Sequence, residues 1–177
     1  MAEKFKVGLA LGSGGVRGMA HFGVIRTLMK YGIKISCVAG VSSGSVIGAA
    51  LAAGKLDAFE DFFRRINWWK MFRMFFELSW PWNGGYLTGK RVKEELRKRL
   101  GDVRFEDCRI PFTAVALDMM NGKEYPISSG DLWTGRLPRS LCRDCSSLWS
   151  MKVTGLRTVV SGIRFLLNIA ARWARTM

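Results

Sequence analysis

The pattern with the clearest chemical meaning is a serine between two glycines. Residues 40–44 (GVSSG) match G-x-S-x-G, the sequence of a nucleophile elbow. Such an elbow is a tight strand-to-helix turn that exposes the serine hydroxyl, and its glycines let neighbouring main chain pass without a Cβ. Here an apolar run precedes the pentapeptide and small residues follow it. The pattern therefore predicts that Ser42 is a nucleophile, with Gly40 and Gly44 shaping its turn.

A glycine-rich loop, residues 12–18 (GSGGVRG), lies upstream of the serine. It does not match the dinucleotide fingerprint, because Arg17 stands where the third glycine belongs, and it lacks the G-K-[ST] ending of a P-loop. Two interpretations remain: a plain glycine turn, or an oxyanion loop whose successive N–H groups donate to a tetrahedral intermediate. We favour the oxyanion loop, because it accompanies a candidate nucleophile and each such donor contributes about 10²–10³ in rate.

The elements around these motifs alternate between strands and helices. Buried strands are predicted at residues 6–11, 35–39 and 112–117, and a turn at Asn121-Gly122 leads into a further extended segment, 123–127. Helices are predicted at 19–31, ending at Gly32, from the elbow through residue 53, at 56–78, and at 88–100 with Thr88 as the cap. This order predicts an α/β fold with a parallel sheet.

The glycine-rich loop at 12–18, followed by G-x-S-x-G at 40–44, resembles the pair of motifs found at this spacing in the patatin-like phospholipases, and in their bacterial branch in particular. Residues 20–24 (AHFGV), 113–118 and 129–133 also look like family segments, so the resemblance covers roughly residues 5–133. It implies a patatin-like three-layer α/β fold with a central, mainly parallel sheet, incomplete at the C-terminus. It also implies a serine acyl hydrolase that cleaves lipid esters and needs neither a metal nor a cofactor.

The resemblance further implies roles for individual residues. Ser42 is the nucleophile, and the main chain of Gly14 and Gly15 forms the oxyanion hole. Gly12, Arg17 and Gly18 support that loop.

The family's general base is an aspartate in a D-G-[GA] motif after the serine, in a Ser-Asp dyad. This sequence contains no Asp-Gly pair, and Asp118 is not followed by glycine. A Ser-His-Asp triad would use His21, the one histidine, as the base, but the resemblance gives it a structural role. The dyad is therefore incomplete, and activity is expected to be impaired.

The charge distribution indicates a boundary after Trp133. The net charge is +14, and residues 132–177 hold eight basic residues and one acidic residue, which is +7 of that total. We predict an acyl hydrolase domain at 1–133 and a basic tail at 134–177.

A change of reading frame can be tested against the genetic code. In the shifted frame, each new codon consists of the third base of one residue's codon and the first two bases of the next. Read in this way, the codons of residues 157–160 (RTVV) can encode D-G-G. A shifted reading frame near residue 134 accounts for the tail; the alternative is a divergent basic tail on a membrane.

Segment 62–82 combines tryptophan and phenylalanine with arginine and lysine, as an interfacial helix or lid over a lipid-binding cleft does. An ordinary packing helix is an equally good explanation. A peripheral contact with anionic membrane is expected, whereas nucleic acid is not favoured, because no recognised reader motif is present.

The cysteines form no zinc or redox motif. Without a secretory signal or a membrane span, the chain is expected to be cytoplasmic. The alternative function is a non-catalytic remnant that binds membrane or nucleic acid.

Overall fold

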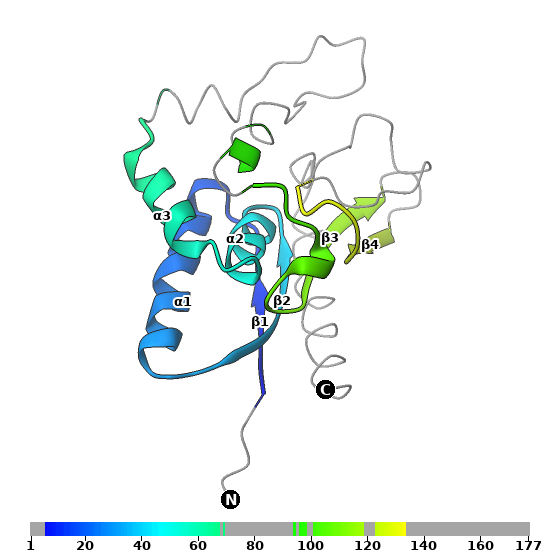
Figure 1. Cartoon of the computed structure of the whole chain (residues 1–177), viewed down its shortest axis with the longest axis horizontal. Coiled ribbons are helices and arrows are strands. Elements are labelled where there is room, and N and C mark those ends of the chain that lie inside the picture. The colour runs from blue at the N-terminus through cyan, green and yellow to red at the C-terminus, as the bar shows by residue number, and fades with distance from the viewer. Residues whose placement is uncertain are drawn as a thin grey trace, which may run out of the picture.

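The computed structural model describes residues 6–67, 69, 94, 96–98, 101–118 and 123–133 (Figure 1). Along the chain the elements are β1 (Val7–Leu11), η1 (Gly15–Met19), α1 (Ala20–Lys30), β2 (Ile35–Val41), α2 (Ser43–Ala52), α3 (Leu56–Arg65), η3 (Phe105–Asp107), β3 (Phe112–Asp118) and β4 (Lys123–Ile127). The alternation of strands and helices confirms the predicted α/β class.

The four described strands form one sheet in the order β1-β2-β3-β4. Strands β1, β2 and β3 are parallel, with Leu11 opposite Gly40 and Ala39 opposite Thr113, and β4 is antiparallel to β3. The predicted turn at Asn121-Gly122 lies outside the described residues. Because parallel strands end at the same edge of a sheet, the segments after β1 and β2 meet there (Figure 1).

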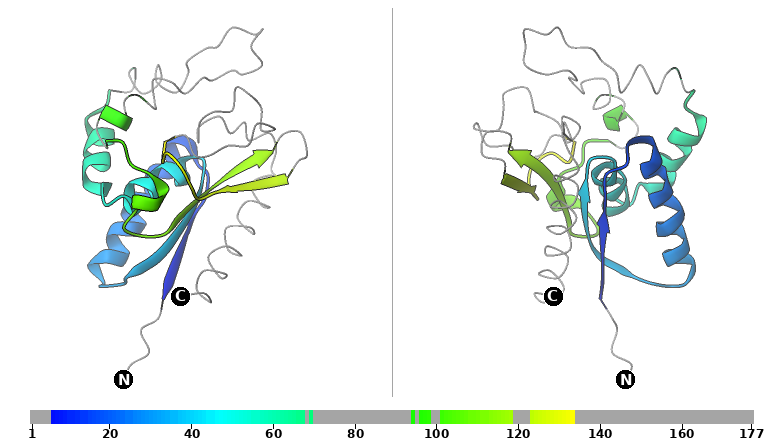
Figure 2. Two further views of the ribbon diagram at one scale, coloured as in Figure 1. Left: turned by 45° about the vertical axis from the view of Figure 1, so that its right-hand side comes forward. Right: turned by 180° about the vertical axis from the view of Figure 1, so that it is seen from behind.

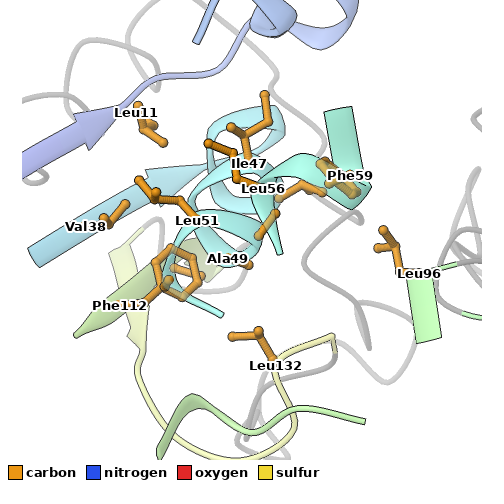
Figure 3. Close-up of a cluster of buried hydrophobic side chains, with 14 of the residues drawn as sticks. Leu11, Val38, Ile47, Ala49, Leu51, Leu56, Phe59, Leu96, Phe112 and Leu132 are labelled. Carbon is orange, nitrogen blue, oxygen red and sulfur yellow. The ribbon is translucent and has the colours of Figure 1, made fainter. Parts of the chain in front are cut away.

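Helix α2 covers the centre of one face of this sheet. Leu11, Val38 and Phe112, one from each parallel strand, lie beside it (Figure 3). The approach is close because α2 consists mainly of small residues: a Cβ on Gly48 would lie 3.0 Å from side-chain atoms of both Phe112 and Val38. Burial of these apolar side chains is the main stabilising contribution to the fold.

Helices α1 and α3 lie on the same side of the sheet as α2 (Figure 2). The rings of Phe22 and Phe59 hold α1 to α3 at a centroid distance of 6.1 Å. On the opposite face, Ala10, Ala39, Val41 and Val115 form a second apolar cluster. A second helical layer on this face, as in the expected three-layer fold, stays a prediction.

Helices α1 and α2 both end at a glycine with a left-handed backbone conformation. Gly32 has φ +71 and Gly54 has φ +68. At the end of α1, the N–H of Ile33 donates to Leu28 O and that of Gly32 donates to Met29 O, as in a Schellman motif. Gly32 therefore terminates α1, as the sequence predicts.

Helix α3 is shorter than expected, and the prediction of one helix over 56–78 is wrong. Ile66 has φ −76 and ψ 128, which is extended, so the helix ends at Arg65. Just beyond, the N–H of Trp69 donates to Oδ1 of Asn67 at 3.2 Å. Trp69 is itself helical, and an asparagine that accepts from the N–H two positions on stands in the position of a helix N-cap, so α3 does not continue through Asn67. Of the helix predicted over 88–100, Glu94 and Leu96–Lys98 are described and are helical, whereas Thr88 lies outside the described residues.

The segment just before residue 134 packs into the main core. Leu132 and Trp133 are buried, and Nε1 of Trp133 donates to Gly101 O at 2.9 Å. Arg97 forms ion pairs with Asp131 and Asp102. The compact part of the described chain therefore reaches Trp133, the last described residue, and the tail predicted at 134–177 lies outside the described residues.

Candidate functional site

Ser42 occupies a strained turn between β2 and α2. Its backbone angles are φ +53 and ψ −124, and it is the one non-glycine residue with positive φ in the described part of the chain. A serine held in this conformation costs about 1–3 kcal/mol, which the surrounding structure must offset. The turn leads directly into α2, where the N–H of Ser45 donates to Ser42 O at 2.9 Å. Ser42 is thus placed at the N-terminal, positive end of a helix.

The two glycines that flank Ser42 lie where no side chain fits. A Cβ on Gly40 would lie 2.7 Å from the carbonyl carbon of Gly44, and a Cβ on Gly44 would lie 2.6 Å from Gly12 O. Both distances are below the closest approach of real Cβ atoms. The main chain of the first turn of α2 therefore packs directly on that of β2 and on that at the end of β1.

The glycine-rich loop after β1 touches this turn at a second place. A Cβ on Gly18 would lie 2.7 Å from the Cβ of Ser43, the residue after Ser42. Inside the loop, Gly15 has φ +53 and the N–H of Arg17 donates to Gly14 O at 3.0 Å. The side chain of Arg17 is exposed, and the group that bonds to Gly14 is the main-chain N–H of Arg17. A Cβ on Gly12 would have nothing within 4 Å, and the φ of Gly12 is not positive. Neither steric crowding nor backbone conformation therefore explains why position 12 is a glycine.

His21 is the second residue of α1 and is half-buried behind the loop. Its Nε2 lies 2.9 Å from Gly12 O. Because a carbonyl oxygen can only accept, Nε2 carries the proton and donates. That nitrogen is therefore engaged as a donor to the loop, which agrees with the structural role expected for His21 over that of a general base.

The described cysteines offer no competing nucleophile. Burial raises the pKa of Cys37, which lies on β2. Burial, together with Asp107 and Glu106, raises the pKa of Cys108 to about 11. The thiolate is the reactive form of cysteine, so the raised pKa makes each of these thiols less reactive near neutral pH than an ordinary cysteine. No cluster of His, Cys, Asp and Glu able to hold a metal ion occurs among the described residues.

A family model described as patatin-like phospholipase matches residues 9–173 of the chain. The chain belongs to the patatin-like phospholipase family. The match begins in β1, includes both glycine motifs and extends past residue 133. Among the described residues, no helix of this family member is long and apolar enough to cross a membrane.

Curated relatives align with a smaller share of the chain. An NTE family protein of Mycobacterium bovis is 38% identical over 127 residues, which is 72% of this chain and 35% of the relative. A lysophospholipase of Kluyveromyces lactis is 32% identical over 135 residues, and a neuropathy target esterase of Drosophila persimilis is 28% identical over 132. In these two the chain spans 9% of the relative's length. The chain therefore corresponds to about a third or less of each of these relatives.

Proposed function

We propose that this chain derives from a serine hydrolase that cleaves phospholipid or another lipid ester through an acyl-enzyme on Ser42. The observation that carries the proposal is the positive φ of Ser42 at the start of α2, against a glycine-rich loop. Strained backbone of this kind clusters at functional sites. Membership of the patatin-like phospholipase family and similarity to a protein named lysophospholipase support a lipid ester as the substrate.

In the proposed reaction, Oγ of Ser42 attacks the ester carbonyl carbon while a base takes the hydroxyl proton. The carbonyl oxygen becomes an oxyanion, which accepts hydrogen bonds from the N–H groups of Gly14 and Gly15. The positive end of α2 stabilises the same charge. Collapse of the intermediate breaks the ester C–O bond, and the alcohol leaves with the proton. Water then hydrolyses the acyl-enzyme by the reverse proton path, which releases the fatty acid and restores Ser42.

The weak point of this chain is the base. The sequence has no Asp-Gly pair, so the aspartate that the family resemblance requires is missing. Loss of one member of a catalytic unit typically costs about 10⁴-fold in rate or more. We therefore propose that the chain as written is nearly inactive. We also propose that residues 134–177 come from a shifted reading frame in which residues 157–160 would be D-G-G.

Two measurements test these proposals separately. A fluorophosphonate probe should label Ser42 once the reading frame is restored by one base inserted near codon 134, and only slowly in the chain as written, because the base is missing there. The Ser42→Ala variant should not be labelled, and equal labelling of the serine and alanine forms would rule out Ser42 as the nucleophile. Insertion of one base near codon 134 should raise hydrolysis of a p-nitrophenyl ester by about 10⁴-fold. If the original chain hydrolyses the ester as fast as the restored one, the missing-aspartate proposal is wrong. If the gene encodes no D-G-G in the shifted frame, the frameshift proposal is wrong.

The charge supports a second candidate function, a non-catalytic remnant that binds anionic membrane or nucleic acid. The net charge is +14, and Trp69, in the aromatic and basic segment 62–82, is 70% exposed. Most of that segment lies outside the described residues. Binding to anionic vesicles should weaken as salt rises, because salt screens the attraction. Binding that survives replacement of Trp68, Trp69 and Phe72 by Ser would count against a contact through this segment.

A further inference from the structure

We infer that His21 is a positioning residue that anchors the first carbonyl of the proposed oxyanion loop, that of Gly12, and so holds the main chain that leads to Gly14 and Gly15. This inference rests on the proposed function only for the role of the loop as an oxyanion hole. The geometry involves three groups: Nε2 of His21 lies 2.9 Å from Gly12 O, and that oxygen also faces Gly44. The Gly12 carbonyl is thus enclosed between the imidazole and the first turn of α2.

Holding this carbonyl also orients the next amide. A trans peptide is planar, and its C=O and N–H point in opposite directions. With Gly12 O turned toward His21, the N–H of Ser13 must point away from the imidazole. The hydrogen bond from His21 therefore determines where the first N–H of the loop is directed.

A second anchor acts two residues later. Gly14 O accepts from the N–H of Arg17 at 3.0 Å, so the N–H of Gly15 points away from the η1 turn. The main chain between Gly12 and Gly14 is therefore held at both ends, through the carbonyl groups of these two residues. One anchor is main chain to main chain, and the other depends on a side chain, that of His21. A substitution at position 21 thus removes one anchor and leaves the other in place.

Two variants separate the hydrogen bond from the volume of the side chain. His21→Leu fills similar space without a donor, whereas the amide of His21→Gln retains an N–H at comparable reach. Thr27→Val serves as the matched control, because it removes another side-chain hydrogen bond of α1, from Oγ1 of Thr27 to Gly23 O at 2.8 Å.

The first measurement is residue-resolved amide hydrogen exchange on the full chain, which needs no catalysis. We expect exchange at residues 13–15 to be faster by about tenfold in His21→Leu. It should be near the wild-type rate in His21→Gln and unchanged in Thr27→Val. Exchange at residues 13–15 that is the same in His21→Leu as in the wild type would overturn the inference.

The second measurement compares labelling of Ser42 by a fluorophosphonate and by its P=S analogue. Oxygen accepts hydrogen bonds from oriented N–H groups well and sulfur accepts them poorly, so the ratio of the two rates reports on the amides. His21→Leu should lower this ratio by about tenfold or more, and His21→Gln should restore it. Equal loss with both reagents would indicate a general structural effect and overturn the inference. If neither reagent labels Ser42 even after the reading frame is restored, the proposed function fails, and amide exchange alone decides the role of His21.

Discussion

The main chain of Gly44 lies against the carbonyl group of Leu11, so closely that a Cβ on Gly44 would be 2.6 Å from the Leu11 carbonyl carbon. Leu11 ends β1 and Gly44 belongs to the first turn of α2. The contact joins the strand before the glycine-rich loop to the helix after Ser42. The loop and the serine turn therefore form one unit, and a change on one side is expected to disturb the other.

Replacement of Gly44 by Ala should strongly destabilise the protein. The new methyl group would meet backbone atoms of Leu11 and Gly12, which cannot move without displacing β1. We expect a loss of about 3 kcal/mol or more in the free energy of unfolding, measured by urea denaturation. Gly23→Ala is the control, because Gly23 is exposed in α1 with nothing within 4 Å of a new Cβ, and it should gain about 0.5–1 kcal/mol. A Gly44→Ala variant as stable as wild type would contradict the packing.

Replacement of Ser42 by Gly should stabilise the fold and abolish labelling by the fluorophosphonate. Glycine adopts φ +53 without strain, so about 1 kcal/mol is expected to be recovered despite the greater entropy of the unfolded chain. Ser42→Ala loses the same hydroxyl and keeps the Cβ, so its stability should stay close to that of wild type. The thermal midpoints of the three proteins test this order. If Ser42→Gly melts below Ser42→Ala, strain at this turn is not significant.

Replacement of Ser45 by Ala should also be stabilising. Ser45 is fully buried on α2, and its Oγ has no hydrogen-bond partner within the described part of the chain. A buried hydroxyl without a partner costs about 1–3 kcal/mol, and alanine is in addition the better helix former. We expect a gain of about 1 kcal/mol in urea denaturation. The reverse change on the same helix, Ala50→Ser at a fully buried site, should be destabilising. Loss of stability in Ser45→Ala would indicate that the hydroxyl has a partner in solution.

The ion pairs of Glu60 should make the contact between α1 and α3 depend on pH. Hydrogen bonds from Arg64 and Arg26 lower the pKa of Glu60. Their contribution is complete above the ordinary pKa of a glutamate and is lost as pH falls through the lowered pKa of Glu60. Because Arg26 is 41% exposed and Arg64 is 73% exposed, the contribution is at most about 1 kcal/mol.

Glu60→Gln should therefore be less stable than wild type at about pH 7, and the difference should shrink as pH falls through the lowered pKa of Glu60 and the wild-type carboxylate becomes protonated. Asp61→Asn, which removes the same charge from an exposed position of α3, should change stability by less than about 0.5 kcal/mol. A difference between Glu60→Gln and wild type that persists at low pH would show that the effect is not electrostatic.

The sequence predicts those parts of the fold that local chemistry determines. Short apolar runs locate β1 and β3, and Gly32 locates the end of α1 through its left-handed conformation. Strand β2 continues two residues past the predicted end at Ala39, to Val41. The reason is tertiary: Gly40 and Val41 pair with Ala114 and Val115 of β3 and so remain in the sheet despite the low strand propensity of glycine.

Other features depend on contacts between distant residues or on weak local signals. The end of α3 at Arg65 was missed because aromatic residues continue the helical spacing, although Asn67 was a signal that the helix could stop. The bond from His21 to Gly12 O follows only when β1, η1 and α1 are in place. Likewise, the ion pair of Arg26 with Glu60 joins two helices and has no local sequence signature.

The order of the strands in the sheet has a consequence for how the protein is made. Because β1-β2-β3-β4 is also the order of synthesis, each strand pairs with the one that left the ribosome before it. Residues 42–111 separate the end of β2 from the start of β3, and their translation takes on the order of several seconds. Throughout that interval the nascent chain presents the apolar edge of β2 (ISCVAGV) without its β3 partner. That edge is therefore the surface most prone to wrong pairing before synthesis is finished.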